Sequence, residues 1–266
     1  MGRRYAAIQR TALRARQASH RRNQPIDGHR RRHAGSGDDR LPVMARRQAA
    51  RPAATVESVA TRKYLLAGAL AAAILFLLLA RWVLSGGAMP FDLWVRAAVQ
   101  GWASPPLTGG MLAVTMLGSE FVLLPLGALL VWRLAATGRR RDAILLAAVS
   151  LAAELAAQSL KLALHRPRPD VFFGLSPAET YSFPSGHAFV STVFYGLLAG
   201  ILMRREPSRW KRASLAALAV LTALAIGFSR VYLGYHYPSD VLGGWACAAA
   251  SLALARLTLP ATAGRK

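Results

Sequence analysis

The chain has 266 residues, of which 54% are hydrophobic and 17% charged, and its 34 Lys and Arg against 12 Asp and Glu give a formal charge of +22. The apolar fraction exceeds the roughly 45–50% that is typical of soluble domains. Residues 1–63 hold 16 of the basic and 4 of the acidic residues, so more than half of the net charge lies in the first quarter. This separation excludes a single soluble globular domain. The single cysteine, Cys247, excludes an intramolecular disulfide framework and a cysteine-ligated metal site.

Residues 1–63 form a basic segment with few large apolar residues and no sustained periodicity. Such a segment cannot bury enough surface to offset its chain entropy, so we expect a disordered cytoplasmic tail. Attraction to anionic inner-leaflet lipid is an alternative to a purely solvated role. Nucleic-acid binding is not expected, because the basic residues are not interleaved with aromatic ones. Met44 also offers a later translation start, which N-terminal sequencing of the native protein would decide.

The rest of the chain contains six apolar windows of about 18 residues or more, the length that crosses roughly 30 Å of hydrocarbon. They predict an all-α, integral-membrane bundle of six transmembrane helices over 64–258, followed by a short cytoplasmic tail at 259–266. Between the first two windows, Trp94 and Trp102 predict a short interfacial helix around 91–101 on the outer surface, with an anchoring role. The windows are 64–84, 111–132, 143–164, 186–203, 213–233 and 239–258.

Orientation follows from the basic residues, since Lys and Arg accumulate in short cytoplasmic loops. The loops 133–142 and 204–212 together carry nine of them, whereas the loops on the opposite side carry five. This asymmetry predicts a multi-pass protein of the cell membrane with both termini in the cytoplasm. The opposite loops are then periplasmic or extracellular.

Three polar clusters lie where the predicted spans meet that outer side. The first is KLALHRPRP at 161–169, in which Lys161 offers a point charge and Arg168 a planar fork for phosphate oxygens. The second is YSFPSGH at 181–187, where a Ser-Gly turn at a helix start exposes backbone N–H groups to an anion and His187 could transfer a proton. The third begins at Ser229-Arg230 and continues to His236 and Asp240.

His236 and Asp240 are four residues apart, about one helical turn, so the carboxylate could fix the imidazole tautomer and leave the other ring nitrogen as a nucleophile. Each cluster alone has an ordinary structural explanation: snorkelling cations, a helix cap, or a structural His and Asp. Together they place three cations, two histidines and one orienting carboxylate on one side of the membrane. That set suits in-line phosphoryl transfer to histidine.

The combined pattern resembles the three-part signature of the type 2 phosphatidic acid phosphatase superfamily, with a match that covers roughly 64–258. The pattern is Lys161-x6-Arg168-Pro169, then Pro184-Ser185-Gly186-His187, then Ser229-Arg230-x5-His236-x3-Asp240. The resemblance implies a metal-independent phosphatase with no cofactor, in which His236 forms a phosphohistidine and Asp240 orients it. His187 would protonate the leaving oxygen and then activate water. The residues implied to hold the phosphate are Lys161, Arg168, Ser185, Gly186 and Arg230.

Three charged residues outside the signature also have predicted roles. Arg166 is a candidate contact to the substrate headgroup. Glu120 and Glu154 fall within predicted spans, where acidic side chains are expensive and face the bundle interior, so both are expected to be hydrogen-bonded structural carboxylates.

The predicted function is that of an integral-membrane lipid phosphatase acting at the outer face on a lipid phosphomonoester or diphosphate. Polyprenyl diphosphate, phosphatidate and phosphatidylglycerophosphate all fit the motifs, and an outer-face site favours polyprenyl diphosphate over phosphatidate. A vanadate-dependent haloperoxidase-like enzyme is one alternative, although that class is soluble. A non-catalytic phospholipid-binding transporter or scaffold is another, although binding alone needs no oriented nucleophile. The sequence does not indicate an oligomeric state.

Overall fold

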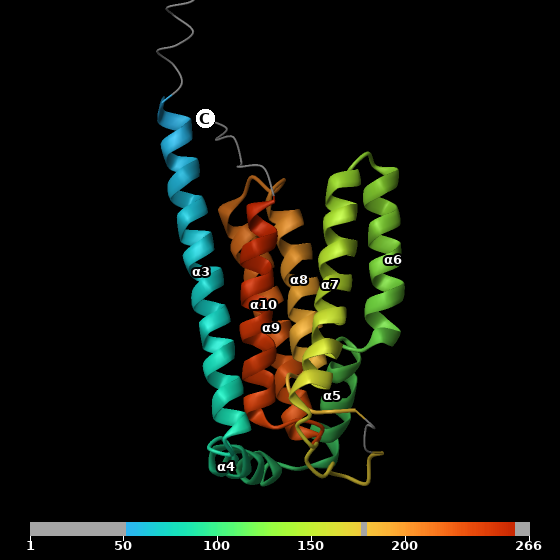
Figure 1. Cartoon of the computed structure of the whole chain (residues 1–266). Helices are drawn as coiled ribbons and strands as arrows, with labels where there is room; N and C mark the ends of the chain where they lie inside the picture. Colours follow the sequence, from blue (N-terminus) through green and yellow to red (C-terminus); the bar gives the residue numbers. More distant parts are fainter. Residues whose placement is uncertain (1–51, 177–179, 259–266) are drawn as a thin grey trace, which may run out of the picture. The chain divides into compact units, whose positions relative to one another are not determined.

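The computed structural model describes residues 52–176 and 180–258, and every regular element within these ranges is an α-helix (Figure 1). The predicted all-α fold is therefore confirmed for the part of the chain that is described. Residues 1–51 of the predicted N-terminal tail lie outside the described part of the chain. The helices are α3 (Pro52–Leu84), α4 (Met89–Gln100), α5 (Pro105–Met116), α6 (Glu120–Ala136), α7 (Arg140–Leu164), α8 (Gly186–Met203), α9 (Arg209–Tyr232) and α10 (Pro238–Leu257).

Five of these helices, α3, α7, α8, α9 and α10, are long and apolar enough to cross a membrane. The pair α5 and α6 supplies a sixth span if its two parts are counted together, although it bends by 41°. Helix α3 begins at Pro52, so the prediction of disorder was wrong for residues 52–63. The apolar run simply continues a helix that starts in more polar sequence, because propagating a helix costs less than nucleating it.

The second predicted span, 111–132, was wrong as a continuous helix, because the chain breaks between Met116 and Glu120. A Cβ on Gly118 would lie 2.7 Å from the Ile226 side chain, so the backbone there packs directly against α9. The break leaves its polar groups satisfied: Ser119 Oγ donates to the Met116 carbonyl at 2.7 Å, and the Tyr195 hydroxyl donates to the Leu117 carbonyl at 2.8 Å. An interrupted helix is tolerated at membrane depth only under that condition.

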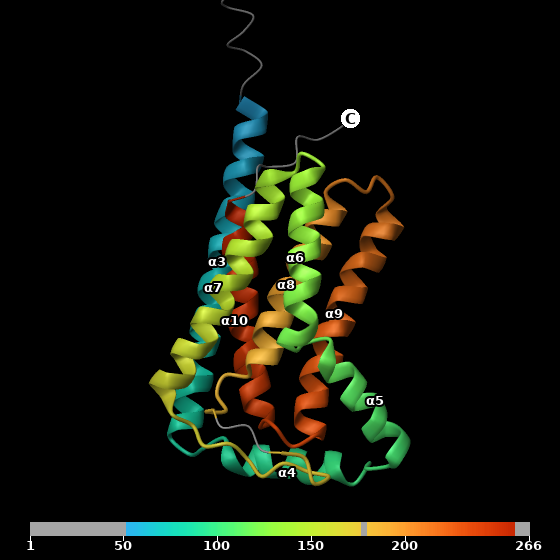
Figure 2. The same cartoon turned by 90° about the vertical axis from the view of Figure 1, so that its right-hand side faces the viewer.

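Helix α4 confirms the short helix predicted around residues 91–101, and it lies across one end of the bundle (Figures 1 and 2). Asp92, Arg96 and Val99 are buried at spacings of four and three, which puts them on one helix face. Leu93 and Trp94 are exposed on the other side. The helix thus reverses the usual amphipathic pattern, because two charged side chains lie on its buried face and large apolar ones on its exposed face.

Helix α8 occupies the middle of the bundle, packed against α7, α9 and α10. Phe189, Val193 and Ile201 on α8 form a buried cluster with residues of α6, α7 and α10. The outward sides of α3, α6, α7 and α9 carry exposed large hydrophobic side chains. This arrangement is the one expected of helices whose outer faces meet lipid.

The two predicted basic loops lie together, at the end of the bundle opposite to α4 (Figures 1 and 2). There Asp142, near the start of α7, forms ion pairs with Arg139 and Arg204. Arg139 also donates to the Ile201 carbonyl at 3.3 Å, which ties the start of α7 to the end of α8. The start of α3 and the end of α10 lie at this same end.

Candidate active site

The three polar clusters predicted from the sequence meet at the end of the bundle that α4 covers. A Cβ on Gly186 would lie 3.5 Å from Lys161 Nζ, so the first and second clusters adjoin. The Ser185 backbone N–H donates to the Asp240 carbonyl at 3.0 Å, which joins the second cluster to the third. Ser182 N–H also donates to the Arg166 carbonyl at 2.9 Å, so the loops of the first two clusters run side by side.

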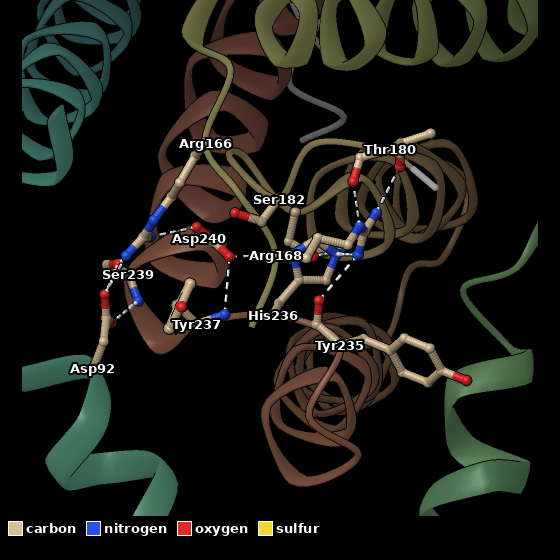
Figure 3. A network of polar contacts seen from close by, with 12 residues as sticks. Asp92, Arg166, Arg168, Thr180, Ser182, Tyr235, His236, Tyr237, Ser239 and Asp240 are labelled. Carbon is tan, nitrogen blue, oxygen red and sulfur yellow. Dashed lines mark hydrogen bonds and ion pairs between the residues drawn. The ribbon is translucent and has the colours of Figure 1, made fainter. Parts of the chain in front are cut away.

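His236 lies in the short turn between α9 and α10 and is 1% exposed. Its ring Nδ1 is 3.3 Å from Asp240 Oδ2, and its backbone N–H donates to the Arg230 carbonyl at 3.2 Å. Pro238 begins α10, and Asp240 in the first turn accepts the Tyr237 N–H at 2.8 Å (Figure 3). With Nδ1–H donating to Asp240, Nε2 carries the lone pair. The contact between the His236 ring and the Asp240 carboxylate that their spacing predicted is thus present.

The surroundings of His236 keep its imidazole neutral. Burial foremost, and then the positive charges of Arg230, Arg168 and Lys161, hold the pKa of His236 well below its ordinary value of 6.5. Only the neutral imidazole has a lone pair for attack. The same positive charges that would bind an anion therefore also favour the neutral form of the ring.

Three cations lie near this imidazole, and within the described part of the chain none of them has a neutralising partner. Lys161, at the end of α7, and Arg230, at the end of α9, are each 7% exposed. Arg168 comes from the loop after α7, and its Nη1 lies 3.3 Å from His236 Nε2. Among the described residues, no carboxylate lies within ion-pair distance of any of the three. Buried positive charge with no internal partner is the electrostatic requirement for an anion site.

Neutral groups hold the two guanidinium groups in place. Arg168 donates to the Thr180 carbonyl at 2.6 Å, to the Thr180 hydroxyl at 2.7 Å and to the Tyr235 carbonyl at 3.0 Å. Arg230 donates to the Thr115 hydroxyl at 2.9 Å and stacks 4.2 Å from the centre of the Tyr235 ring. Arg230 Nε is buried with no partner among the described residues. A phosphate oxygen would satisfy such a donor.

The Ser-Gly-His turn begins α8, as predicted. Ser185 is the N-cap residue and is fully buried, with its hydroxyl oxygen 3.5 Å from the Ala188 N–H. Gly186 allows Lys161 to approach closely, and His187 follows in the first turn. His187 lies near enough to His236 and the three cations to interact electrostatically with each of them. Its position suits transfer of a proton at a phosphate held by those cations.

The predicted roles outside the signature had mixed outcomes. Arg166 is 7% exposed and pairs with two carboxylates, so its predicted contact to a headgroup was wrong. Glu120 is exposed at the start of α6, so its predicted interior position was also wrong. The prediction for Glu154 is confirmed only for its hydrogen bond, which it accepts from Gln158 at 2.7 Å; the contact is exposed and the residue half-buried, so an interior position is not shown.

The sequence analysis missed three residues that hold the site together, namely Asp92, Thr115 and Thr180. Asp92 could have been found from the sequence, because it lies four residues before Arg96 in the predicted interfacial helix and the two charges therefore share one helix face. Thr115 and Thr180 could not, because a single threonine in an apolar helix or a polar loop is ordinary.

Comparisons with known proteins find membrane phosphatases among the relatives of this chain. A family model described as the PAP2 superfamily matches residues 142–262. Phosphatidylglycerophosphatase B of Bacillus subtilis is 34% identical over 154 residues, which cover 56% of this chain and 73% of that protein. Undecaprenyl-diphosphatase of Sulfolobus acidocaldarius is 30% identical over 144 residues, covering 52% and 64%. The crystal structure of a transmembrane PAP2-type phosphatidylglycerolphosphate phosphatase from Bacillus subtilis matches with a TM-score of 0.66 and 29% identity, over 71% of this chain and 94% of that one.

Proposed function

The chain belongs to the PAP2 superfamily of lipid phosphatases, and we propose that this multi-pass membrane hydrolase releases phosphate from a lipid through a phosphohistidine on His236. The observation that carries the proposal is the environment of His236. The ring is buried with Asp240 on Nδ1 and Arg168 on Nε2. A phosphate that displaces the Arg168 contact would lie directly in front of the Nε2 lone pair.

In the first step, Nε2 of His236 forms a bond to phosphorus while the bond from phosphorus to the lipid oxygen breaks. Asp240 stabilises the ring as its positive charge develops. Lys161, Arg168 and Arg230 bind the equatorial oxygens, on which negative charge spreads in such transfers. The Gly186 turn lets Lys161 come close to the phosphate from the α8 side.

His187 carries the proton in both steps. It donates its proton to the leaving lipid oxygen, and the neutral ring then takes a proton from water as that water attacks phosphorus. The nitrogen–phosphorus bond breaks, inorganic phosphate leaves, and His187 is again protonated for the next cycle. This assignment is supported by its place in the first turn of α8, and by the negative charge of a bound phosphate, which favours the protonated ring against the repulsion of the nearby cations.

We assign no metal to the reaction. The groups that would contact a phosphate are two guanidinium groups and one ammonium group, which repel a divalent cation and supply the positive charge that a metal would otherwise bring. Asp240, which approaches His236, already accepts hydrogen bonds from Arg166 and Tyr237. Phosphate release should therefore persist in excess chelator.

The proposed membrane face is the outer one. The site lies at the end of the bundle opposite to the loops 133–142 and 204–212, and basic loops are typically cytoplasmic (Figure 1). In a Cys247→Ala background, a membrane-impermeant maleimide applied to intact cells should label Ser176→Cys, an exposed position in the loop between α7 and α8, but not Arg205→Cys in the basic loop. The reverse labelling would place the site on the cytoplasmic side.

The substrate that we propose first is a polyprenyl diphosphate, ahead of phosphatidylglycerophosphate and phosphatidate, because the site is assigned to the outer face. The relatives named above act on two of these three headgroups. The test is phosphate release from each of the three lipids by the purified full chain in nanodiscs, with and without chelator. A higher kcat/KM for phosphatidate than for the diphosphate would overturn the ranking.

The phosphohistidine is tested in the same preparation. Rapid acid-free quenching with a ³²P-labelled substrate should trap a base-stable, acid-labile phosphoprotein in the unchanged chain and none in His236→Ala. His236→Ala should still insert and elute as a single species. Substantial turnover by that variant would show that another group is the nucleophile.

A further inference from the structure

Helix α4 presents a buried carboxylate to the segment that carries the nucleophile. Asp92 is fully buried, and its Oδ1 accepts the Ser239 N–H at 2.9 Å while its Oδ2 accepts the Ser239 hydroxyl at 2.6 Å. Ser239 lies directly before Asp240 at the start of α10. A residue 147 positions earlier in the chain is thus bonded to the neighbour of the orienting carboxylate (Figure 3).

Arg166 joins Asp92 to Asp240. Its Nη2 donates to Asp92 Oδ2 at 2.6 Å, and its Nη1 donates to Asp240 Oδ1 at 2.5 Å and to the Ser239 hydroxyl at 2.8 Å. The guanidinium lies 4.1 Å from the centre of the Tyr237 ring, which fixes its plane. Both terminal nitrogens are engaged, so this arginine has an internal role, in contrast to Arg168 and Arg230.

The two oxygens of Asp240 are divided between two tasks. Oδ1 is held by Arg166, while Oδ2 accepts the Tyr237 N–H and faces Nδ1 of His236. A buried carboxylate needs a compensating charge, and removing that charge leaves an expensive unpaired ion. Arg166 supplies the charge on the side away from His236, which leaves Oδ2 to orient the imidazole.

A second contact from α4 holds the other side of the nucleophile turn. Arg96, one helical turn after Asp92, donates to the Gly234 carbonyl at 3.1 Å and to the Asp170 carbonyl at 2.7 Å. The segment with His236 is therefore fixed before it, at Gly234, and after it, at Ser239. Both fixing groups come from the buried face of α4.

We propose that Arg166 and Asp92 are positioning residues of the reaction. With Asp240 they form a chain of hydrogen-bonded charged groups from α4 to His236, which we call the relay. This proposal rests on the proposed function, because it assigns a purpose to the geometry of the nucleophile. The relay does not touch the phosphate. It sets the direction of the Asp240 carboxylate and thereby the direction of Nε2 toward phosphorus.

The test compares Arg166→Gln and Asp92→Asn with variants of the partly exposed Arg–Asp cluster at the opposite end, Arg204→Gln and Asp142→Asn, in nanodiscs. Misdirecting a reacting atom by about 1 Å costs roughly 100-fold in rate. We therefore expect kcat to fall about 10- to 100-fold in the two relay variants, with KM changed less than about twofold. The two variants at the opposite end should keep the kcat of the unchanged chain.

The pH dependence of kcat/KM separates positioning from general loosening. Removing Arg166 leaves the charge of Asp240 uncompensated, which favours protonated His236 and raises the pKa of His236. The acid limb, which reports the neutral nucleophile, should then move to higher pH. Asp92→Asn removes a negative charge and leaves Arg166 to Asp240 alone, so its acid limb should stay or move to lower pH.

Among the described residues, the other charged or titratable groups that face His236 are the same in both variants, so the difference between the two limbs belongs to the relay. These groups are Asp240 of α10, Arg230 of α9, Lys161 of α7, His187 of α8, Arg168 of the loop after α7 and, beyond Asp240, Arg96 of α4. Acid limbs that shift together in the same direction would contradict the relay.

Further variants keep the test decisive if Arg166→Gln does not purify as a single species. Ser239→Ala removes only the hydroxyl shared by Arg166 and Asp92 and should lower kcat a few-fold at constant KM. Arg166→Lys, whose ammonium lacks the two-armed fork, should restore only part of the lost rate.

If kcat and acid limb stay unchanged in the relay variants while His236→Ala is inactive, the relay is wrong and the proposed function stands. An active His236→Ala would instead overturn the function.

Discussion

The two ends of the helix bundle each hold aspartate against arginine, yet only one has the geometry of an active site. At the α4 end, Arg166 lies between Asp92 and Asp240, with side-chain exposures of 7% for the arginine and 0% for both acids. At the opposite end, Asp142 lies between two arginines, and all three side chains are 15 or 16% exposed. The pairing is similar, but one cluster has an acid in surplus and the other a base.

The decisive difference lies next to the clusters. At the α4 end, Lys161, Arg168 and Arg230 stand beside His236 with no carboxylate in ion-pair distance among the described residues. At the opposite end, the arginines either pair with Asp142 or reach the surface, where water and lipid headgroups screen them. Counting basic residues therefore does not locate a phosphate site. Buried positive charge that the chain leaves unpaired does.

The most sensitive test of the difference between the two ends replaces one aspartate by asparagine at each end. Asp240→Asn should lower kcat about 10⁴-fold, since an amide in place of the orienting carboxylate favours the wrong tautomer and loses the charge that stabilises the imidazolium. Asp142→Asn should leave kcat unchanged, because its partners lie far from His236. The measurement is phosphate release from a lipid phosphate at saturating substrate.

Thermal unfolding of both variants in nanodiscs provides the control, because each loses an aspartate that is bonded to arginine. A loss of activity in Asp142→Asn as deep as that in Asp240→Asn would show that the whole bundle, rather than the oriented imidazole, limits the reaction.

The second comparison is between an unpaired and a paired arginine. Arg230→Gln should lower kcat/KM at least about 100-fold, the cost of removing one preorganised donor to a developing negative charge. Arg204→Gln should leave kcat/KM within about twofold. Vanadate adopts the five-coordinate geometry of the transition state, so its inhibition of the unchanged chain should weaken in Arg230→Gln and persist in Arg204→Gln.

An equal loss of vanadate inhibition in both variants would contradict the assignment of Arg230 to the phosphate. Elution of each variant as a single species is the accompanying control, since Arg230 also packs on Tyr235.

Much of this molecule could be read from the sequence because membrane helices and phosphate chemistry each need particular residue types. A spanning helix needs an apolar run of fixed length, so α8 was predicted with its bounds at 186 and 203. A carboxylate one helical turn from a histidine can orient its ring, and this spacing, together with the other two clusters and the family resemblance, pointed to His236 and Asp240. Their distance and relative orientation agree with the prediction, while their chemical roles remain proposals.

What the sequence could not show are features that depend on close packing between distant segments. The break between α5 and α6 is invisible to hydropathy, because Gly118 and Ser119 are compatible with a membrane helix and only contact with α9 requires a bare backbone there. The partners of Arg166 were equally hidden, since one of them is 74 residues away on α4. Thr115, in an apolar helix, gave no sign of its contact with Arg230.

Thr115 provides the smallest and most specific test of the difference between the two ends. Its hydroxyl accepts from Arg230 at 2.9 Å in a buried position, whereas the exposed Thr137 hydroxyl, at the end of α6, donates to the Arg133 and Leu134 carbonyls of its own helix. A net hydrogen bond is worth about 1 kcal/mol, or about fivefold. Thr115→Val should therefore lower kcat/KM about fivefold by releasing Arg230, and Thr137→Val should leave it unchanged. If Thr115→Val also leaves it unchanged while Arg230→Gln is impaired, the phosphate itself, and not α5, orients this arginine.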